Sequence, residues 1–129
     1  MLDLERLRSG LINLGFRPTD SAVPSTLQFM YEGGSYYLEI DEKDDQYVRV
    51  GFPGFFTVTQ DKQVRALKVA NKVTESIKAV KVFLFEDKVY CSVEQFVKDE
   101  DEILRFLMRY LMVMQGAAKA FVTQYSNGD

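Results

Sequence analysis

The fold is decided by residues 26–52, which read TLQFMYEGGSYYLEIDEKDDQYVRVGF. Apolar and polar side chains alternate through three segments of this stretch, and a period of two is typical of a half-buried strand. Gly33-Gly34 separates the first two segments, and the polar run 41–45 separates the last two. Such short connections join antiparallel neighbours, so the sequence predicts a meander. Its three predicted strands are residues 26–31, 35–41 and 47–52.

A helix is predicted on each side of this meander. Leucines recur at helical spacing through residues 2–14, with charged residues between them, and Gly15 follows as a stop signal. After the meander, Pro53-Gly54 interrupts the pattern, and residues 61–77 then place apolar side chains on one arc of a second helix.

A second hairpin and a last helix complete the predicted order. Residues 81–85 and 88–93 form the hairpin, and the first of these strands is apolar enough to be covered on both faces. Asp99, followed three residues later by Glu102, resembles a capping box and predicts a helix from there to about residue 123. A frayed polar tail is expected at 124–129.

The last helix carries more apolar surface than one sheet can cover. A helix packed on one side of a sheet needs an apolar arc of about 100°. Here the apolar side chains extend nearly all round the helix, so we expect a second structure to cover the remainder. These side chains are Ile103, Leu104, Phe106, Leu107, Met108, Tyr110, Leu111, Met112, Val113 and Met114.

Length and composition predict one α+β domain, residues 1–129, with helices packed on an antiparallel sheet. The formal net charge of -3 argues against a nucleic-acid partner, which needs clustered Lys and Arg. The longest apolar stretch, residues 103–114, is too short and too charged to span a membrane. A single cysteine forms no intramolecular disulfide, which is consistent with the cytoplasm.

Catalytic and metal-binding constellations are not recognisable in the sequence. Histidine is absent, which removes His-based triads and most zinc sites. Cys91 lies in a predicted strand, where a buried, inert thiol is expected. An enzyme would need carboxylates such as Glu39, Asp41 or Glu94 to converge in a cleft. We therefore expect a protein that is not an enzyme and needs no cofactor and no metal.

Two groups of residues are candidates for binding a partner. Tyr37 faces away from Tyr36, and tyrosine is enriched at interfaces. The methionines of the last helix suit an adaptable binding surface, or alternatively fill gaps in the core. The candidate interface residues are Leu104, Met108, Leu111, Met112 and Tyr37. A second group, Arg65, Lys68 and Lys72, forms a stripe on the second helix that suits an acidic partner, the alternative being a solvated face.

The predicted order is helix, three strands, helix, two strands, helix, and it resembles the type III secretion chaperone-like fold and its YbjN-like family. Local features carry the resemblance: Leu14-Gly15-Phe16 at the end of the first helix, the Gly33-Gly34 hairpin, Val48-Arg49-Val50 and the long apolar last helix. The resemblance implies a homodimeric, cytoplasmic protein-binding module with a chaperone-like or regulatory role.

A second interpretation of the same pattern is a small-molecule or lipid-binding domain. An apolar sheet closed by an apolar helix is able to leave a ligand cavity between the two layers. The residues expected to line it are Leu27, Phe29, Leu38, Val48 and Val50. A tightly packed contact between sheet and helix would reject this interpretation.

Overall fold

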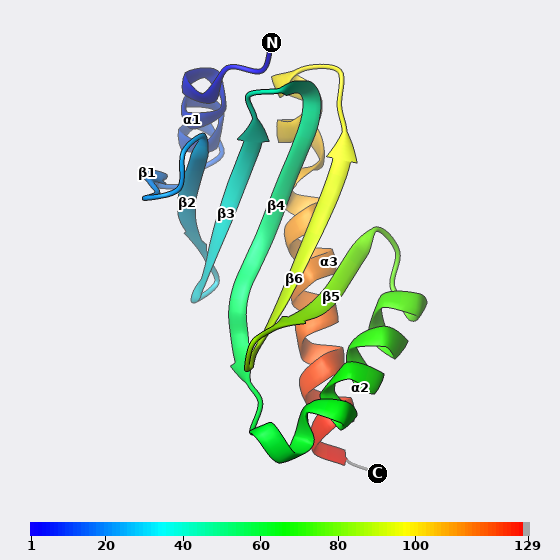
Figure 1. The fold of residues 1–129 in the computed structure, drawn as a ribbon. Helices are drawn as coiled ribbons and strands as arrows, with labels where there is room; N and C mark the ends of the chain where they lie inside the picture. The colour runs from blue at the N-terminus through cyan, green and yellow to red at the C-terminus, as the bar shows by residue number, and fades with distance from the viewer. Residues whose placement is uncertain (128–129) are drawn as a thin grey trace.

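A six-stranded antiparallel sheet with helices packed on it confirms the predicted α+β class, in a computed structural model that describes residues 1–127. The strands lie in the order β1-β2-β3-β4-β6-β5 (Figure 1). They are β1 (Thr19–Asp20), β2 (Thr26–Tyr31), β3 (Gly34–Asp41), β4 (Asp44–Thr57), β5 (Val80–Phe85) and β6 (Lys88–Phe96). The helices are α1 (Leu4–Asn13), α2 (Gln63–Ser76) and α3 (Glu100–Asn127), with a short 3-10 turn, η1 (Gln60–Lys62), before α2. Strand β1 lies within residues 17–25, where two prolines and several turn formers predict a loop.

The helices cover only one face of the sheet. In Figure 1, α3 passes behind β4 and β6, with α1 beyond β2 and α2 beside β5. The core lies between these layers, where fully buried side chains of α3 such as Leu107 and Met114 meet those of the sheet such as Leu38 and Val50. Within residues 1–127, no helix lies over the opposite face of the sheet, here called the uncovered face (Figure 1).

Strand β4 continues through Pro53-Gly54, so the predicted break at this point is wrong. The pairing of β4 with β6 shifts its register here, and Gly54 adopts a positive φ of 55°. Proline and glycine are tolerated in a strand at such a bulge, because the local ladder is already interrupted. The bulge also directs Phe55 and Phe56 toward Phe121 of α3, at ring-centroid distances of 6.0 and 5.8 Å.

The predicted start of α3 is confirmed in its details. The Asp99 carboxylate accepts a hydrogen bond from the backbone amide of Glu102 at 3.0 Å. The Glu102 carboxylate in turn accepts from the amide of Lys98 at 2.7 Å, so it reaches one residue further back than in a standard capping box. The helix ends later than expected, because Tyr125 still packs on Phe121. The predicted tail therefore began too early, and its residues 128 and 129 lie outside the described part.

Strand β5 is an edge strand with one covered face, which corrects the expectation that both faces would be covered. Val80 and Val82 are buried on the helix side. Phe83 lies half-exposed on the other side and stacks on Tyr90 at 5.6 Å between ring centroids. A neighbour on the same face thus covers part of Phe83, while Phe85 at the end of the strand stays exposed.

Helix α2 also provides hydrogen-bond partners for two backbone groups on the free edge of β5. The Thr74 hydroxyl accepts a hydrogen bond from the Val82 amide at 2.8 Å and donates to the Val82 carbonyl at 3.3 Å. An unpaired strand edge is prone to join other strands, and one threonine removes part of that hazard here.

Replacing Thr74 by Val keeps the side-chain shape and removes both hydrogen bonds. We expect Thr74→Val to lower the free energy of unfolding by about 1–3 kcal/mol, because two backbone groups of Val82 lose their partner. Thr74→Ser is the matched control and should stay within about 1 kcal/mol of the wild type. Urea unfolding measures both, and equal losses in the two variants would show that the hydroxyl is unimportant.

Candidate binding surfaces

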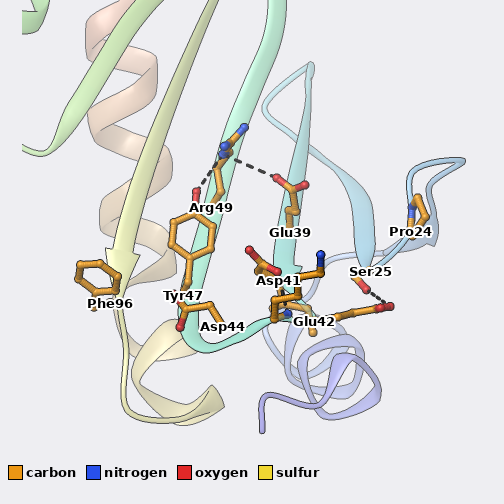
Figure 2. Close-up of a pocket in the computed structure, with 11 residues that line it drawn as sticks. Pro24, Ser25, Glu39, Asp41, Glu42, Asp44, Tyr47, Arg49 and Phe96 are labelled. Atoms are coloured by element: carbon orange, nitrogen blue, oxygen red, sulfur yellow. Dashed lines mark hydrogen bonds and ion pairs between the residues drawn. The ribbon is translucent and has the colours of Figure 1, made fainter.

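A row of charged side chains crosses the uncovered face of the sheet. Glu39 of β3 lies directly opposite Arg49 of β4, which lies directly opposite Glu94 of β6. The Arg49 guanidinium is 3.7 Å from a carboxylate oxygen of each neighbour. Lys81 of β5 forms a further ion pair with Glu94. Figure 2 shows Arg49 aligned with Glu39 across this face.

Tyrosine 47 ties this row together. Its hydroxyl donates a hydrogen bond to the Glu94 carboxylate. It also accepts one from Nε of Arg49 at 3.2 Å, which Figure 2 shows. The hydrogen bond from Lys81 and then that from Tyr47 lower the pKa of Glu94. Burial, followed by the contact with Glu94, raises the pKa of Tyr47. Both groups therefore hold fixed protonation states near neutral pH, which suits a structural network better than proton transfer.

The Tyr37 ring lies across the backbone of Gly51. A Cβ atom at position 51 would stand 2.2 Å from the ring, so the ring keeps this place only over a glycine. Ser92, the partner of Gly51 in β6, is consequently buried although it lies on the uncovered face. Its Oγ has no hydrogen-bond partner among the described residues. Tyr37 is thus half-buried and lies flat on the sheet, rather than projecting from it.

A shallow hollow of about 610 Å³ lies at one end of the uncovered face (Figure 2). Its rim includes Phe96, whose side chain is 81% exposed, the most exposed phenylalanine of the chain. The remaining lining comes mostly from the β3–β4 turn and from the row of charges. These residues are Pro24, Ser25, Glu39, Ile40, Asp41, Glu42, Lys43, Asp44, Tyr47 and Arg49.

Two acidic residues of the hollow, Asp41 and Asp44, hold the turn formed by the polar run 41–45. Asp41 accepts a hydrogen bond from the amide of Lys43 at 2.8 Å, and Asp44 accepts one from the amide of Gln46 at 3.1 Å. Within residues 1–127, no group of three or more His, Cys, Asp or Glu side chains is placed to hold a metal ion.

Of the three carboxylates that an enzyme would need, Glu39 and Asp41 both line the hollow, and Glu39 and Glu94 are held in ion pairs. Glu39 and Glu94 lie on opposite sides of Arg49, and each is paired with it. Burial raises the pKa of the Cys91 thiol to about 12, so this cysteine is protonated near neutral pH, as expected for an inert core residue. The predicted ligand cavity between sheet and helix stays a prediction: the residues expected to line it are buried in the core, and the Cys91 thiol lies 3.8 Å from the carbonyl of Met114 between the two layers.

The predicted interface residues divide between two faces of the molecule. Tyr37 belongs to the uncovered sheet, whereas the other four belong to α3, in the helix layer. Leu111 is fully buried, so its prediction as an interface residue is wrong: it lies on the arc that faces the sheet. Leu104 is half-buried at α1, where its side chain occupies the space beside Gly10. Met108 and Met112 remain at the surface, 41% and 62% exposed.

The predicted basic stripe lies along a groove between α2 and the end of α3. Arg65, Lys68 and Lys72 all line it, with Asp61 as its one acidic lining residue, and its volume is about 660 Å³. The Arg65 guanidinium stands 5.4 Å from the centre of the Tyr125 ring, a cation–π distance. The structure thus places all three predicted cations at one site.

Sequence reasoning missed Phe96 and the role of Arg49. Residue 49 lies between two buried valines, and that alternation already predicted an outward side chain. Its two carboxylate partners come from different strands. Only the pairing of these strands in the folded sheet places both partners opposite Arg49. Phe96 lies beyond the predicted end of its strand. It is the last residue of β6 and pairs with Tyr47 of β4, with its side chain on the uncovered face.

Comparison with known proteins supports the fold. No family model and no curated protein matches the sequence. The crystal structure of YbjN from E. coli, a protein put forward as a transcription regulator, is similar with a TM-score of 0.67 and 14% identity, over 89% of this chain and 87% of that one. The Yersinia pestis type III secretion chaperone SycH, solved in complex with a stable fragment of YscM2, is similar with a TM-score of 0.55 and 7% identity, over 94% and 98%. The predicted chaperone-like, YbjN-like fold is therefore confirmed.

The charged row predicts a specific loss of stability in acid. Because the pKa of Glu94 is lowered in the folded chain, the unfolded chain binds its proton more readily, and folding is favoured while Glu94 is ionised. The contribution is complete above the ordinary pKa of 4.5 and is lost as the pH falls through the lower folded value.

We expect Glu94→Gln to reduce the free energy of unfolding at pH 7 by about 1–2 kcal/mol. This loss lies between the contribution of an exposed ion pair and that of a hydrogen bond to a charged group. The difference from the wild type should shrink below about pH 4.5. Urea unfolding at several pH values measures this, with the exposed Glu75→Gln as control for the loss of one acidic side chain. A difference that stays constant down to pH 2 would contradict the role of the carboxylate.

Proposed function

We propose that this chain is a non-enzymatic protein-binding module that acts as a homodimer, in a chaperone-like or regulatory role. The observation that carries the proposal is the uncovered face of the sheet, which offers Tyr47 and the exposed Phe96 around a hollow. Aromatic residues and arginine are enriched at protein interfaces, whose rim is polar. SycH was solved with a bound protein fragment, and neither SycH nor YbjN is described as an enzyme.

The homodimer is proposed through the exposed methionines of α3. Met108 and Met112 are four residues apart, so they lie next to each other on one side of the helix. Methionine adapts its shape to a partner surface, and a second copy of the same helix offers the same side chains in return. The interface would cover part of the apolar surplus that the sequence predicted for this helix.

The remaining attributes of the proposal follow from composition. Residues 1–129 are proposed to form one domain that works in the cytoplasm, where the single buried Cys91 stays reduced. Within residues 1–127, no helix is long and apolar enough to cross a membrane. The net charge of -3 speaks against nucleic acid as the partner.

A charge placed at Met112 of α3 tests the homodimer. We expect sedimentation velocity to show a dimer at micromolar concentration, and Met112→Glu to raise its dissociation constant at least ~10-fold, because a carboxylate would be buried without a partner. Met30→Glu is the matched control, since Met30 is 60% exposed, close to the 62% of Met112, and lies on β2. A wild-type monomer, or equal weakening by both variants, would overturn the dimer.

The uncovered face is tested separately by the capture of native partners. Phe96→Ser should remove at least one protein that co-purifies with the wild type, because truncating a central aromatic anchor typically costs more than about 2 kcal/mol. Phe85→Ser, an exposed phenylalanine at the far end of β5, is the matched control. Identical sets of co-purifying proteins for the wild type and both variants would contradict a partner surface at Phe96.

A further inference from the structure

The groove between α2 and the end of α3 carries a concentration of positive charge on a chain that is acidic overall. Arg65, Lys68 and Lys72 line it, and among residues 1–127 none of the three forms an ion pair with a carboxylate. The chain as a whole has a net charge of -3. The local charge of the groove is therefore positive while the net charge of the chain is negative. A positive groove favours an anionic partner.

The cations are ordered along the groove rather than clustered at a point. They occupy positions i, i+3 and i+7 of α2, which spans about 10 Å along the helix axis. The Arg65 guanidinium is held in the groove wall over the Tyr125 ring, which itself stacks on Phe121. Arg65 and the two exposed lysines therefore form a row of three positive charges. Such a row matches several carboxylates of an extended or helical segment better than it matches one small anion.

Apolar side chains also line the groove, so a matching partner would have apolar groups as well as negative charges. Val64 is exposed and Val69 is half-buried, and both lie among the cations. The volume of about 660 Å³ has room for several side chains of a peptide. A flat membrane would reach fewer of the cations in a recessed groove, and a nucleic acid is bound by a larger set of basic residues.

We propose that this groove binds an acidic segment of another protein, with carboxylates at i, i+3 or i+4, and i+7 and apolar side chains between them. Such a segment would place one carboxylate against each cation and its apolar side chains on Val64 and Val69. This inference rests on the proposed protein-binding function, and it adds a second binding surface with a partner of defined chemistry.

Selection from a displayed library of random 16-residue peptides against the folded, full-length chain tests this proposal. Selected peptides should be acidic with interspersed apolar residues, and fluorescence anisotropy should show at least tenfold weaker binding to the double variant Lys68→Glu/Lys72→Glu. The control Lys78→Glu/Lys119→Glu changes the net charge equally at exposed positions outside the groove, and it should bind like the wild type. Circular dichroism confirms that both variants are folded.

Several outcomes would overturn the groove proposal. They are an absence of enriched peptides, peptides without net negative charge, equal binding to the two double variants, or binding of vesicles with anionic lipid in place of peptide. Peptides that are insensitive to the groove variant but lost with Phe96→Ser would overturn this inference and leave the proposed function standing. Sedimentation of the wild type reports on the homodimer independently of all these outcomes.

Discussion

The structure depends on one constraint: the three helices cover a single face of a six-stranded sheet. Burial of α3 against β4 and β6 supplies the main apolar contact, and fully buried residues such as Leu107 and Leu111 come from one arc of that helix. The other face must be stabilised without a second layer. The row Glu39-Arg49-Glu94 and the Tyr37 ring over Gly51 do this with ion pairs and one flat aromatic side chain.

The same constraint decides where binding surfaces are possible. A sheet face without a helix keeps exposed aromatic side chains such as Phe96 available to a partner, while the paired charges around them limit nonspecific association. On the helix side, the outer arc of α3 keeps Met112 exposed, and the groove beside α2 keeps its lysines exposed. Each surface thus follows from what the single helix layer leaves uncovered.

Much of the fold was predictable because alternation and helical spacing are local signals. They identified the meander, the three helices and the cap at Asp99, which the structure confirms. The errors arose where a tertiary contact decides the outcome. The bulge at Pro53-Gly54 persists because the strand regains its pairing with β6 at Phe56, and Leu111 is buried because the sheet selects one arc of an apolar helix. The basic stripe was visible in sequence, but its groove requires the end of α3.

The proposed homodimer joins two copies of this chain through Met108 and Met112 of α3. The most direct test is the distance between two spin labels in solution, with a single cysteine placed at Met112 in a Cys91→Ala background and, for comparison, at Met30. A dimer through α3 should give a short, narrow intermolecular distance for the label at residue 112 and a longer one at residue 30. A label at residue 112 that shows no intermolecular distance, or a shorter distance at residue 30, would contradict it.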